Sequence, residues 1–207
     1  MNAPSKKVTE LASKIIAAPR AGHRKLVAIG GAPASGKSTL AEQLAAQLTN
    51  MGCASKVVPM DGFHLDNRIL AKRGMQERKG APETFDVSGF ARMVKSLHGS
   101  DEVFVPIFDR SRDIAIACAD VVGSDCDTLV IEGNYLLLDE PFWRDLRAEW
   151  DVAIMLKVPI AVLRERLVAR WLAYGLSPAD AQKRARGNDL PNAERVTGAV
   201  TSFDIEF

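Results

Sequence analysis

The chain alternates between short runs of consecutive apolar residues and longer stretches in which apolar residues recur every three or four positions. The runs predict buried strands at residues 25–29, 56–60, 128–131 and 152–158. The periodic stretches predict helices at residues 38–48, 87–97, 141–147, 159–174 and 178–186. Strands that are apolar throughout need cover on both faces, and helices that alternate with them supply it in a parallel sheet. The pattern therefore predicts an α/β fold.

The pattern is weaker in five other segments. Residues 8–15 have the spacing of a short amphipathic helix. Residues 62–85 are basic and predict loops, while residues 103–108 are extended. The apolar stretch 114–122 is either the second strand of a hairpin or a contact between two copies of the chain. Residues 200–207 alternate imperfectly between apolar and polar, which indicates a short strand that closes the sheet.

The length and charge of the chain limit its partners. We expect a single domain over residues 1–207, because 207 residues are enough to bury one core. The formal net charge is +1, so no overall field attracts nucleic acid or a membrane surface. No apolar run approaches the length of a membrane span. We therefore expect neither a nucleic-acid nor a membrane partner, and a bound anion requires a local site.

The cysteines and histidines indicate a reduced compartment and no zinc site. The three cysteines lack metal-ligand spacing and the three histidines are scattered along the chain: Cys53, Cys118, Cys126, His23, His64 and His98. Unpaired thiols are typical of cytosolic proteins. We therefore expect the chain in the cytoplasm.

A glycine-rich segment joins the first predicted strand to the helix at 38–48, and we call residues 31–39 the phosphate loop. Residues 31–38 fit the pattern G-x-x-x-x-G-K-[ST]. The backbone N–H groups of such a loop wrap a nucleotide phosphate, and the positive end of the next helix points at the same anion. The residues expected to bind the nucleotide are Gly31, Ala32, Pro33, Ala34, Ser35, Gly36, Lys37, Ser38 and Thr39.

Individual positions of this loop have separate roles. Gly31 and Gly36 are expected where the backbone has positive φ or approaches the phosphate closely. Lys37 reaches the β- and γ-phosphate oxygens and stabilises the group in transfer, while the hydroxyl of Ser38 ligates Mg²⁺. The position between a strand and a helix is the context that this motif requires. The sequence therefore predicts a nucleoside triphosphate and Mg²⁺ as cofactors.

Missing motifs exclude several classes of nucleotide-binding protein. The chain has neither the guanine-reading N-K-x-D of GTPases nor an LSGGQ-like segment of transporter ATPases. One short domain without repeats disfavours a motor or a helicase. Small-molecule kinases and nucleotide kinases remain, and they differ in the acceptor. An alcohol is helped by a carboxylate that takes its proton, whereas a phosphate is already a nucleophile.

Acidic residues stand at the ends of two predicted strands. Asp61 follows the strand 56–60, and the carboxyl ends of parallel strands line the ligand crevice, so Asp61 is placed to be a general base. A turn cap before Gly62 is the alternative interpretation. Glu132 follows the strand 128–131, where a carboxylate contacts Mg²⁺ or its water shell. A solvent-facing acid at the edge of the sheet is the alternative there.

The helix predicted at residues 159–174 carries two arginines four positions apart. Arg166 and Arg170 share one face of this helix. A lid of approximately residues 160–187 could bring them over the phosphates, where they would stabilise the transition state and exclude water. A solvated arginine face is the alternative interpretation.

With these residues in place, the chain from Leu26 to about Val196 resembles the uridine kinase, phosphoribulokinase and pantothenate kinase group of P-loop kinases. The resemblance is carried by the phosphate loop, the Asp61 segment and the stretches APETFDV, VPIFDRSR and VIEGNY. Within the group the chain is most similar to bacterial fructose transport system kinases, through MDGFHLDN, RKGAPETFD and NDLPNAERV. The implied fold is that of the P-loop NTP hydrolases, a parallel sheet with helices on both faces and a small helical lid.

The resemblance also implies roles for individual residues. Asp61 would be the base on the acceptor hydroxyl, and Arg166 and Arg170 would be lid arginines. Asn188 and Asn192, in a loop after the last helix, would lie near the adenine. The acceptor pocket would include His64, Arg78, Asp86, Asp109 and Arg110. Turn structure competes with the role given to the two asparagines, and loop hydrogen bonds or a helix cap compete in the pocket.

One position departs from the uridine kinases, which have tyrosine where this chain has Phe108. That departure favours an acceptor other than a pyrimidine nucleoside. The sequence thus predicts an ATP-dependent kinase that phosphorylates a hydroxyl of a small molecule, with fructose first, as a monomer or homodimer. A nucleoside or pantothenate-like acceptor is one alternative. A nucleotide-sensing regulatory protein without a dedicated acceptor is the other.

Overall fold

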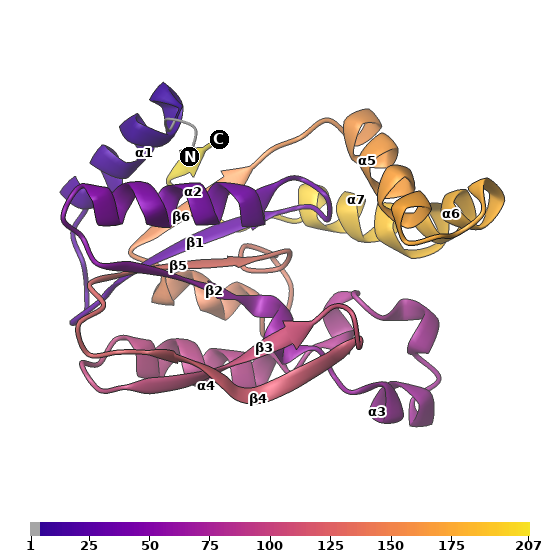
Figure 1. The fold of residues 1–207 in the computed structure, drawn as a ribbon, viewed down its shortest axis with the longest axis horizontal. Coiled ribbons are helices and arrows are strands. Elements are labelled where there is room, and N and C mark those ends of the chain that lie inside the picture. The colour runs from indigo at the N-terminus through magenta and orange to yellow at the C-terminus, as the bar shows by residue number, and fades with distance from the viewer. Residues whose placement is uncertain (1–4) are drawn as a thin grey trace.

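The large sheet of this protein is parallel and five-stranded, in the order β2-β5-β1-β6-β7 (Figure 1). The computed structural model describes residues 5–207. The strands of this sheet are β1 (Lys25–Gly31), β2 (Ser55–Pro59), β5 (Thr128–Gly133), β6 (Val152–Leu156) and β7 (Ile205–Glu206). The expected α/β fold with a parallel sheet is confirmed, and so is the closing strand at the C-terminal end, because β7 pairs in parallel with β6.

Helices cover both faces of the large sheet (Figure 1). Helices α1 (Lys6–Ala17) and α2 (Lys37–Asn50) pack on one face, and α4 (Val87–Leu97) and the 3₁₀ helix η4 (Arg144–Glu149) pack on the other. Alternate residues of β1 enter the two resulting cores, Val27 on the side of α1 and Leu26 on the side of α4. This two-sided burial explains why the strands are apolar throughout. Among residues 5–207, no helix combines the length and apolar character that crossing a bilayer demands.

A separate antiparallel hairpin consists of β3 (Val103–Asp109) and β4 (Ile114–Val122). Of the two interpretations of residues 114–122, the hairpin is therefore confirmed. The pairing register of β3 with β4 shifts between Val105 and Ile107, at Pro106. On the opposite strand, Cys118 has φ +52. Proline has no N–H to donate to a ladder, so a bulge opposite it is expected.

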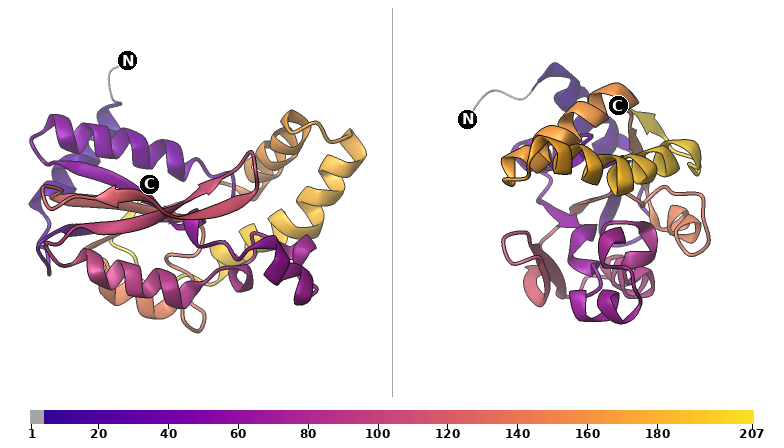
Figure 2. Two further views of the ribbon diagram at one scale, coloured as in Figure 1. Left: turned by 60° about the horizontal axis from the view of Figure 1, so that its bottom comes forward. Right: turned by 90° about the vertical axis from the view of Figure 1, so that its right-hand side faces the viewer.

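Four helical elements lie beyond the carboxyl ends of the large sheet's strands (Figures 1 and 2). They are α5 (Ile160–Ala173), α6 (Pro178–Arg184), the π-helical turn η5 (Ala185–Asp189) and α7 (Leu190–Gly198). The helix predicted over 178–186 is present as α6 and the start of η5, but the prediction of a loop after it is wrong. The helical run continues to Gly198, because a π-helical turn accommodates Pro191 where a regular helix would break.

Two other sequence predictions need correction. Residues 62–85, expected as loops, include parts of four short helices, η1 (Met60–Phe63), α3 (Asn67–Lys72), η2 (Gln76–Arg78) and η3 (Pro82–Thr84). The helix expected over 141–147 is instead the 3₁₀ helix η4, which begins at Arg144. Phe142 has φ +70, a left-handed backbone that no regular helix contains, so the apolar spacing could not be realised there.

Candidate active site

The phosphate loop is closely packed where it leaves β1, and two of its residues before α2 have a left-handed backbone conformation. A Cβ on Gly31 would lie 3.0 Å from the carbonyl oxygen of Leu156, so glycine is required by close approach. Gly36 has φ +98, as the motif predicts. Ala34 also has positive φ, +63, which the motif does not predict. These turns let the loop fold over the N-terminal end of α2.

The donors of this loop are incompletely paired. Helix α2 begins at Lys37 and no side chain caps it, so its first N–H groups are free for an anion. The Lys37 ammonium is buried, and its best partner is the Ala32 carbonyl at 3.4 Å. Burial lowers the pKa of Lys37, while Glu132 and Asp61 act in the opposite direction. The Ser35 hydroxyl is buried without a partner. This set of unspent donors fits the phosphates of a nucleotide.

The oxygens expected to hold magnesium lie side by side. The Ser38 hydroxyl donates a hydrogen bond to Oε1 of Glu132 over 3.0 Å. Glu132 belongs to β5 itself, one residue before the strand ends. Burial raises the pKa of Glu132, and the nearby Lys37 opposes that effect. A hydroxyl and a carboxylate beside the phosphate loop are oxygen ligands of the kind Mg²⁺ takes, so the residues fit this ion.

Asp61 lies in η1, directly after β2 and beside the phosphate loop. The short helix is held against the hairpin at Gly62, where a Cβ would lie 2.4 Å from the Pro106 carbonyl oxygen. Nη2 of Arg110, at the tip of the hairpin, donates to Oδ2 of Asp61 over 2.7 Å. Tight packing and an ion pair therefore fix the carboxylate, and only about a fifth of its side chain is exposed.

Two cavities meet at Asp61. The phosphate cavity has a volume of about 500 Å³ and is lined by Pro33, Ala34, Gly36, Lys37, Ser38, Thr39, Asp61, Arg110, Glu132, Asn134, Arg166, Arg170 and Tyr174. The outer cavity has a volume of about 550 Å³ and is lined by Pro33, Asp61, His64, Asn67, Gln76, Lys79, Gly80, Phe108, Arg110, Asp113, Asn134, Arg170, Trp171, Tyr174, Arg184, Asp189 and Asn192. Asp61 borders both, so a carboxylate stands between a phosphate site and a second binding space.

The two arginines of α5 differ in position. Nη1 of Arg166 donates to the carbonyl oxygens of Ala34 at 3.3 Å and Ser35 at 3.1 Å, on the phosphate loop itself. Arg166 borders the phosphate cavity only, whereas Arg170 borders both cavities. The shared helix face predicted from their spacing is thus directed at the site.

His64 forms part of an aromatic wall of the outer cavity. Its ring lies between Phe85, with centroids 4.1 Å apart, and Phe108, with centroids 4.6 Å apart. Nδ1 lies 2.8 Å from the Asp61 carbonyl oxygen. A carbonyl only accepts, so Nδ1 carries the proton. Burial lowers the pKa of His64. The neutral ring then has Nε2 as a hydrogen-bond acceptor.

Lys79 lines the same cavity, but its donors are committed. Its ammonium donates to Oδ1 of Asn67 at 2.8 Å and to the carbonyl oxygen of Asp113 at 2.9 Å. It also pairs with the Asp113 carboxylate at 2.9 Å and lies 5.2 Å from the centroid of the Phe108 ring. An ammonium has three N–H bonds, and these acceptors use them all. Lys79 therefore shapes the wall and has no donor left for a bound anion.

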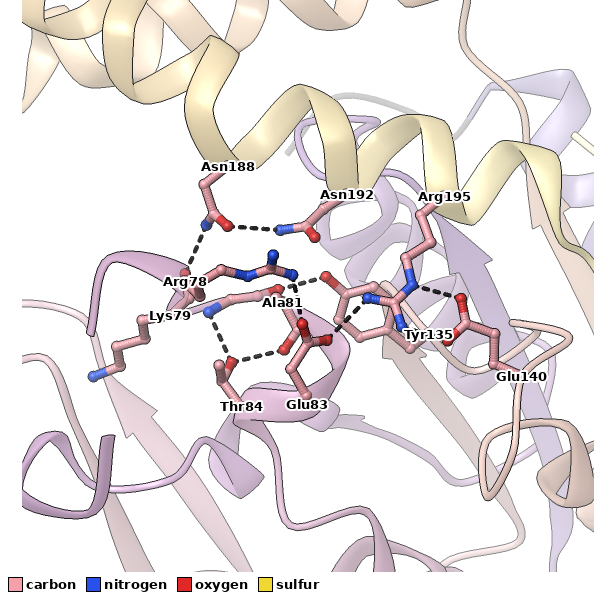
Figure 3. Close-up of polar contacts among 11 residues, drawn as sticks. Arg78, Lys79, Ala81, Glu83, Thr84, Tyr135, Glu140, Asn188, Asn192 and Arg195 are labelled. Atoms are coloured by element: carbon pink, nitrogen blue, oxygen red, sulfur yellow. Dashed lines mark hydrogen bonds and ion pairs between the residues drawn. The ribbon is translucent and has the colours of Figure 1, made fainter. Parts of the chain in front are cut away.

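The two asparagines lie on the helical run rather than in a loop (Figure 3). Both are buried. Asn188 donates to the Lys79 carbonyl oxygen over 3.0 Å and borders neither cavity. Asn192 donates to Oδ1 of Asn188 over 3.3 Å and borders the outer cavity.

Three residues expected in the acceptor pocket border neither cavity. Arg78 pairs with Glu83 at 2.5 Å. Asp86 caps α4 by accepting from the N–H of Gly89, and Asp109 accepts from residues 111 and 112 in the hairpin turn. The competing interpretations, loop hydrogen bonds and a helix cap, describe these contacts. His64 and Arg110 do border the outer cavity.

Sequence reasoning missed several residues of the outer cavity. Trp171 carries an indole N–H that donates to Asp189 over 2.5 Å, and the Arg184 guanidinium lies 5.3 Å from its ring centroid. Burial raises the pKa of Asp189. Trp171 has the spacing of an apolar helix face with Leu163 and Leu167, and this spacing gives no signal of a polar role. Asn134, which borders both cavities, stands in the VIEGNY stretch, and that was its only signal.

Comparison with known proteins connects this site to kinases. Residues 26–172 match the phosphoribulokinase / uridine kinase family. The chain is 52% identical to a Silicibacter sp. TM1040 protein, provisionally assigned as a fructose transport system kinase, with a TM-score of 0.94 over 98% of this chain and 100% of that one. It is 36% identical to YggC of Escherichia coli (strain K12), over 84% of this chain and 73% of the relative. A pantothenate kinase of Chelativorans sp. (strain BNC1) is 30% identical, over 71% of this chain and 49% of the relative.

Proposed function

This chain belongs to the phosphoribulokinase / uridine kinase family, and on that premise we propose that it transfers the γ-phosphoryl group of MgATP to a hydroxyl of a sugar or sugar-like alcohol, with fructose first. The family makes the chain an ATP-dependent kinase, so the proposal concerns the acceptor and the residues. The observation that carries it is the position of Asp61, which borders both the phosphate cavity and the outer cavity. Donor and acceptor would meet at this carboxylate.

The phosphate loop would hold the triphosphate, and Ser38 with Glu132 would hold Mg²⁺. When bound, MgATP supplies the phosphoryl group and the metal charge that offsets its oxygens. The Lys37 ammonium is fixed by burial and would stabilise charge on the transferring group. Arg170, at the junction of the cavities, would do the same from the opposite side. Approximately residues 160–187 would act as a lid that excludes water.

Asp61 would take the proton of the acceptor hydroxyl. A carboxylate in this role must be ionised and must stay within hydrogen-bond reach of the hydroxyl. The guanidinium of Arg110 pairs with the carboxylate and restricts its position by a hydrogen bond. Since more than half of the Arg110 side chain is exposed, it can move aside as the acceptor enters.

The outer cavity supports an acceptor that carries hydroxyl groups. Among the cations that line it, Lys79 has all its donors committed within the protein. His64 offers the Nε2 acceptor, and Asn67, Gln76 and Asn192 bring amides to the same wall. Acceptors and amides suit hydroxyl groups, since an O–H can both donate and accept. The assignment of the Silicibacter relative points in the same direction.

A nucleoside is the second candidate acceptor, and one observation favours it. The outer cavity is lined by aromatic rings of His64, Phe108, Trp171 and Tyr174, on which a base could stack. Sugars also pack against rings, so the aromatic wall does not decide between them.

The test is ADP release from MgATP with a panel of fructose, other hexoses, pentoses, uridine, cytidine and pantothenate. We expect a hexose or pentose to raise the rate well above the rate without acceptor. Stimulation by a nucleoside alone would move the assignment to the second candidate. A flat panel, with ATP binding confirmed separately by calorimetry, would contradict the proposed acceptor class.

A further inference from the structure

We propose that Asn188 is a positioning residue that fixes one wall of the outer cavity by holding the backbone of Lys79. The inference rests on the proposed function, because it treats the outer cavity as the acceptor site. It gives Asn188 a role different from contact with the adenine. Figure 3 shows Asn188 and Asn192 on the helical run, facing the segment that carries Lys79, Ala81 and Glu83.

The π-helical turn η5 directs Asn188 toward that segment. Pro191 has no N–H for the carbonyl of Gly187 four positions earlier, and its ring would clash with that carbonyl in a regular helix. A wider turn relieves the clash and rotates the residues within it, and such turns are frequent at functional sites. Asn188 lies within the turn and is 5% exposed.

Both ends of the Asn188 amide are committed within the protein. The Lys79 carbonyl can only accept, so the atom that meets it at 3.0 Å must be the NH₂ group of Asn188. Oδ1 of Asn188 then accepts from the NH₂ group of Asn192 at 3.3 Å. The orientation of the amide follows from these partners. An amide used in this way is poorly suited to read a nucleobase.

The segment that Asn188 holds is attached to the rest of the protein by a few polar contacts. The Tyr135 hydroxyl donates to the Gly80 carbonyl oxygen over 2.5 Å, and the Arg184 guanidinium donates to the Glu77 carbonyl oxygen over 2.6 Å. Within the segment, the Gly80 N–H donates to Oγ1 of Thr84 over 3.0 Å. Asn188 supplies the contact at Lys79, which lies along the chain between the contacts at Glu77 and Gly80.

A shift of this segment would reach the outer cavity directly. Lys79 and Gly80 both line it. Lys79 lies over the Phe108 ring, and Phe108 stacks on His64. Without the Asn188 contact, the wall would lose its attachment to the helical run at Lys79, and the contacts of Arg184 with Glu77 and of Arg195 with Glu83 would remain on either side. The phosphate loop touches none of these contacts, so nucleotide binding should be unaffected.

The first test is hydrogen exchange over residues 76–84 in Asn188→Ala and in the isosteric Asn188→Asp, which cannot donate to the Lys79 carbonyl. We expect exchange in this segment to accelerate by about tenfold, as for loss of one buried hydrogen bond, with exchange in residues 31–39 unchanged. Gln182→Ala is the control, since Gln182 is an exposed amide on the neighbouring α6 with no hydrogen bond within residues 5–207. Unchanged exchange in both variants would overturn the proposal.

The second test separates the acceptor from the nucleotide. With the best acceptor of the panel, we expect the acceptor KM to rise about tenfold in both Asn188 variants, while the ATP Kd from calorimetry stays within about twofold. A weakened ATP Kd with an unchanged acceptor KM would overturn the proposal in favour of an adenine contact. If the wild-type protein uses no acceptor, the proposed function fails, and the exchange experiment still decides the role of Asn188.

Discussion

Nη2 of Arg110 lies 2.7 Å from Oδ2 of Asp61, at the place where the two cavities of the protein meet. The hairpin β3–β4 brings the arginine and the end of β2 brings the carboxylate, so the pair joins the small sheet to the large one. The pair keeps the carboxylate within reach of both cavities. Phosphoryl transfer to an alcohol needs a carboxylate at this position, whereas a nucleotide sensor does not.

The two arginines of α5 should have separable effects. Arg166 borders only the phosphate cavity, so Arg166→Ala should raise the KM for ATP and leave the acceptor KM within about twofold. Arg170 borders both cavities, so Arg170→Ala should raise both KM values and lower kcat by about tenfold or more. Steady-state kinetics with each substrate varied measures the difference.

Arg164→Ala is the matched control for this comparison, because Arg164 is exposed on the same helix and borders neither cavity. It should behave as the wild-type protein does. If the two substitutions changed the KM for ATP and the KM for the acceptor equally, the assignment of Arg166 to the phosphate cavity alone and of Arg170 to both cavities would be contradicted.

The burial of His64 should make stability depend on pH. Burial lowers its pKa in the folded protein, so as the pH falls below about 6.5 the unfolded chain binds a proton that the folded chain does not. The resulting loss of stability begins near pH 6.5 and is complete below the folded pKa. Its slope in that window is at most about 1.4 kcal/mol per pH unit.

Urea unfolding of the wild type and of His64→Gln between pH 7.5 and pH 5 measures this effect. The charged groups that face His64 are Asp61, Lys79 and Asp113, and they remain in both proteins. The wild type should lose more stability over the window than the variant does. If the free energy of unfolding fell equally with pH in the two proteins, the lowered pKa of His64 in the folded protein would be contradicted.

Arg24 should be a main contributor to stability although it lies far from the site. Its side chain is fully buried and donates to five carbonyl oxygens, those of Leu97, Gly99, Ser100, Asp101 and Gly123. Arg24→Met would remove a fully buried guanidinium and its hydrogen bonds to these carbonyl oxygens, and we expect a loss of about 3 kcal/mol or more in urea unfolding.

Arg20 provides the comparison for Arg24, since it forms an exposed ion pair with Asp127 at 2.7 Å. Arg20→Ala should cost no more than about 1 kcal/mol, because exposed ion pairs are screened by solvent. Similar losses of stability in the two variants would show that these five carbonyl oxygens do not depend on Arg24.

The sequence contains most of what determines the phosphate side of the site. The phosphate loop is predictable because its chemistry fixes both residue types and spacing, and Asp61 is predictable because parallel strands end at one edge. The bounds of α4 are also correct, since its apolar spacing and the Asp86 cap agree. The phosphate loop, the segment from the end of β2 to Asp61 and helix α4 are each formed by a short continuous segment, so local sequence is enough to predict them.

The outer cavity could not be predicted in the same way. Lys79, Asn67 and Asp113 come from three separate segments of the chain, and no periodicity indicates that they meet. The position of Asn188 depends on a π-helical turn that apolar spacing does not reveal, because glycine and proline, here Gly187 and Pro191, are residues at which helices usually end. The lining of this cavity follows from contacts between distant segments, and only the folded chain brings them together.

The central claim is that Asp61 is the general base between the two cavities, and Asp61→Asn tests it most directly. Asp66→Asn, which keeps its cap on α3 and borders neither cavity, is the matched control. The measurement is acceptor-dependent ADP release together with the ATP Kd. The account predicts that Asp61→Asn lowers kcat by at least about 10²-fold while the ATP Kd stays within about twofold. Wild-type turnover by Asp61→Asn would contradict the account.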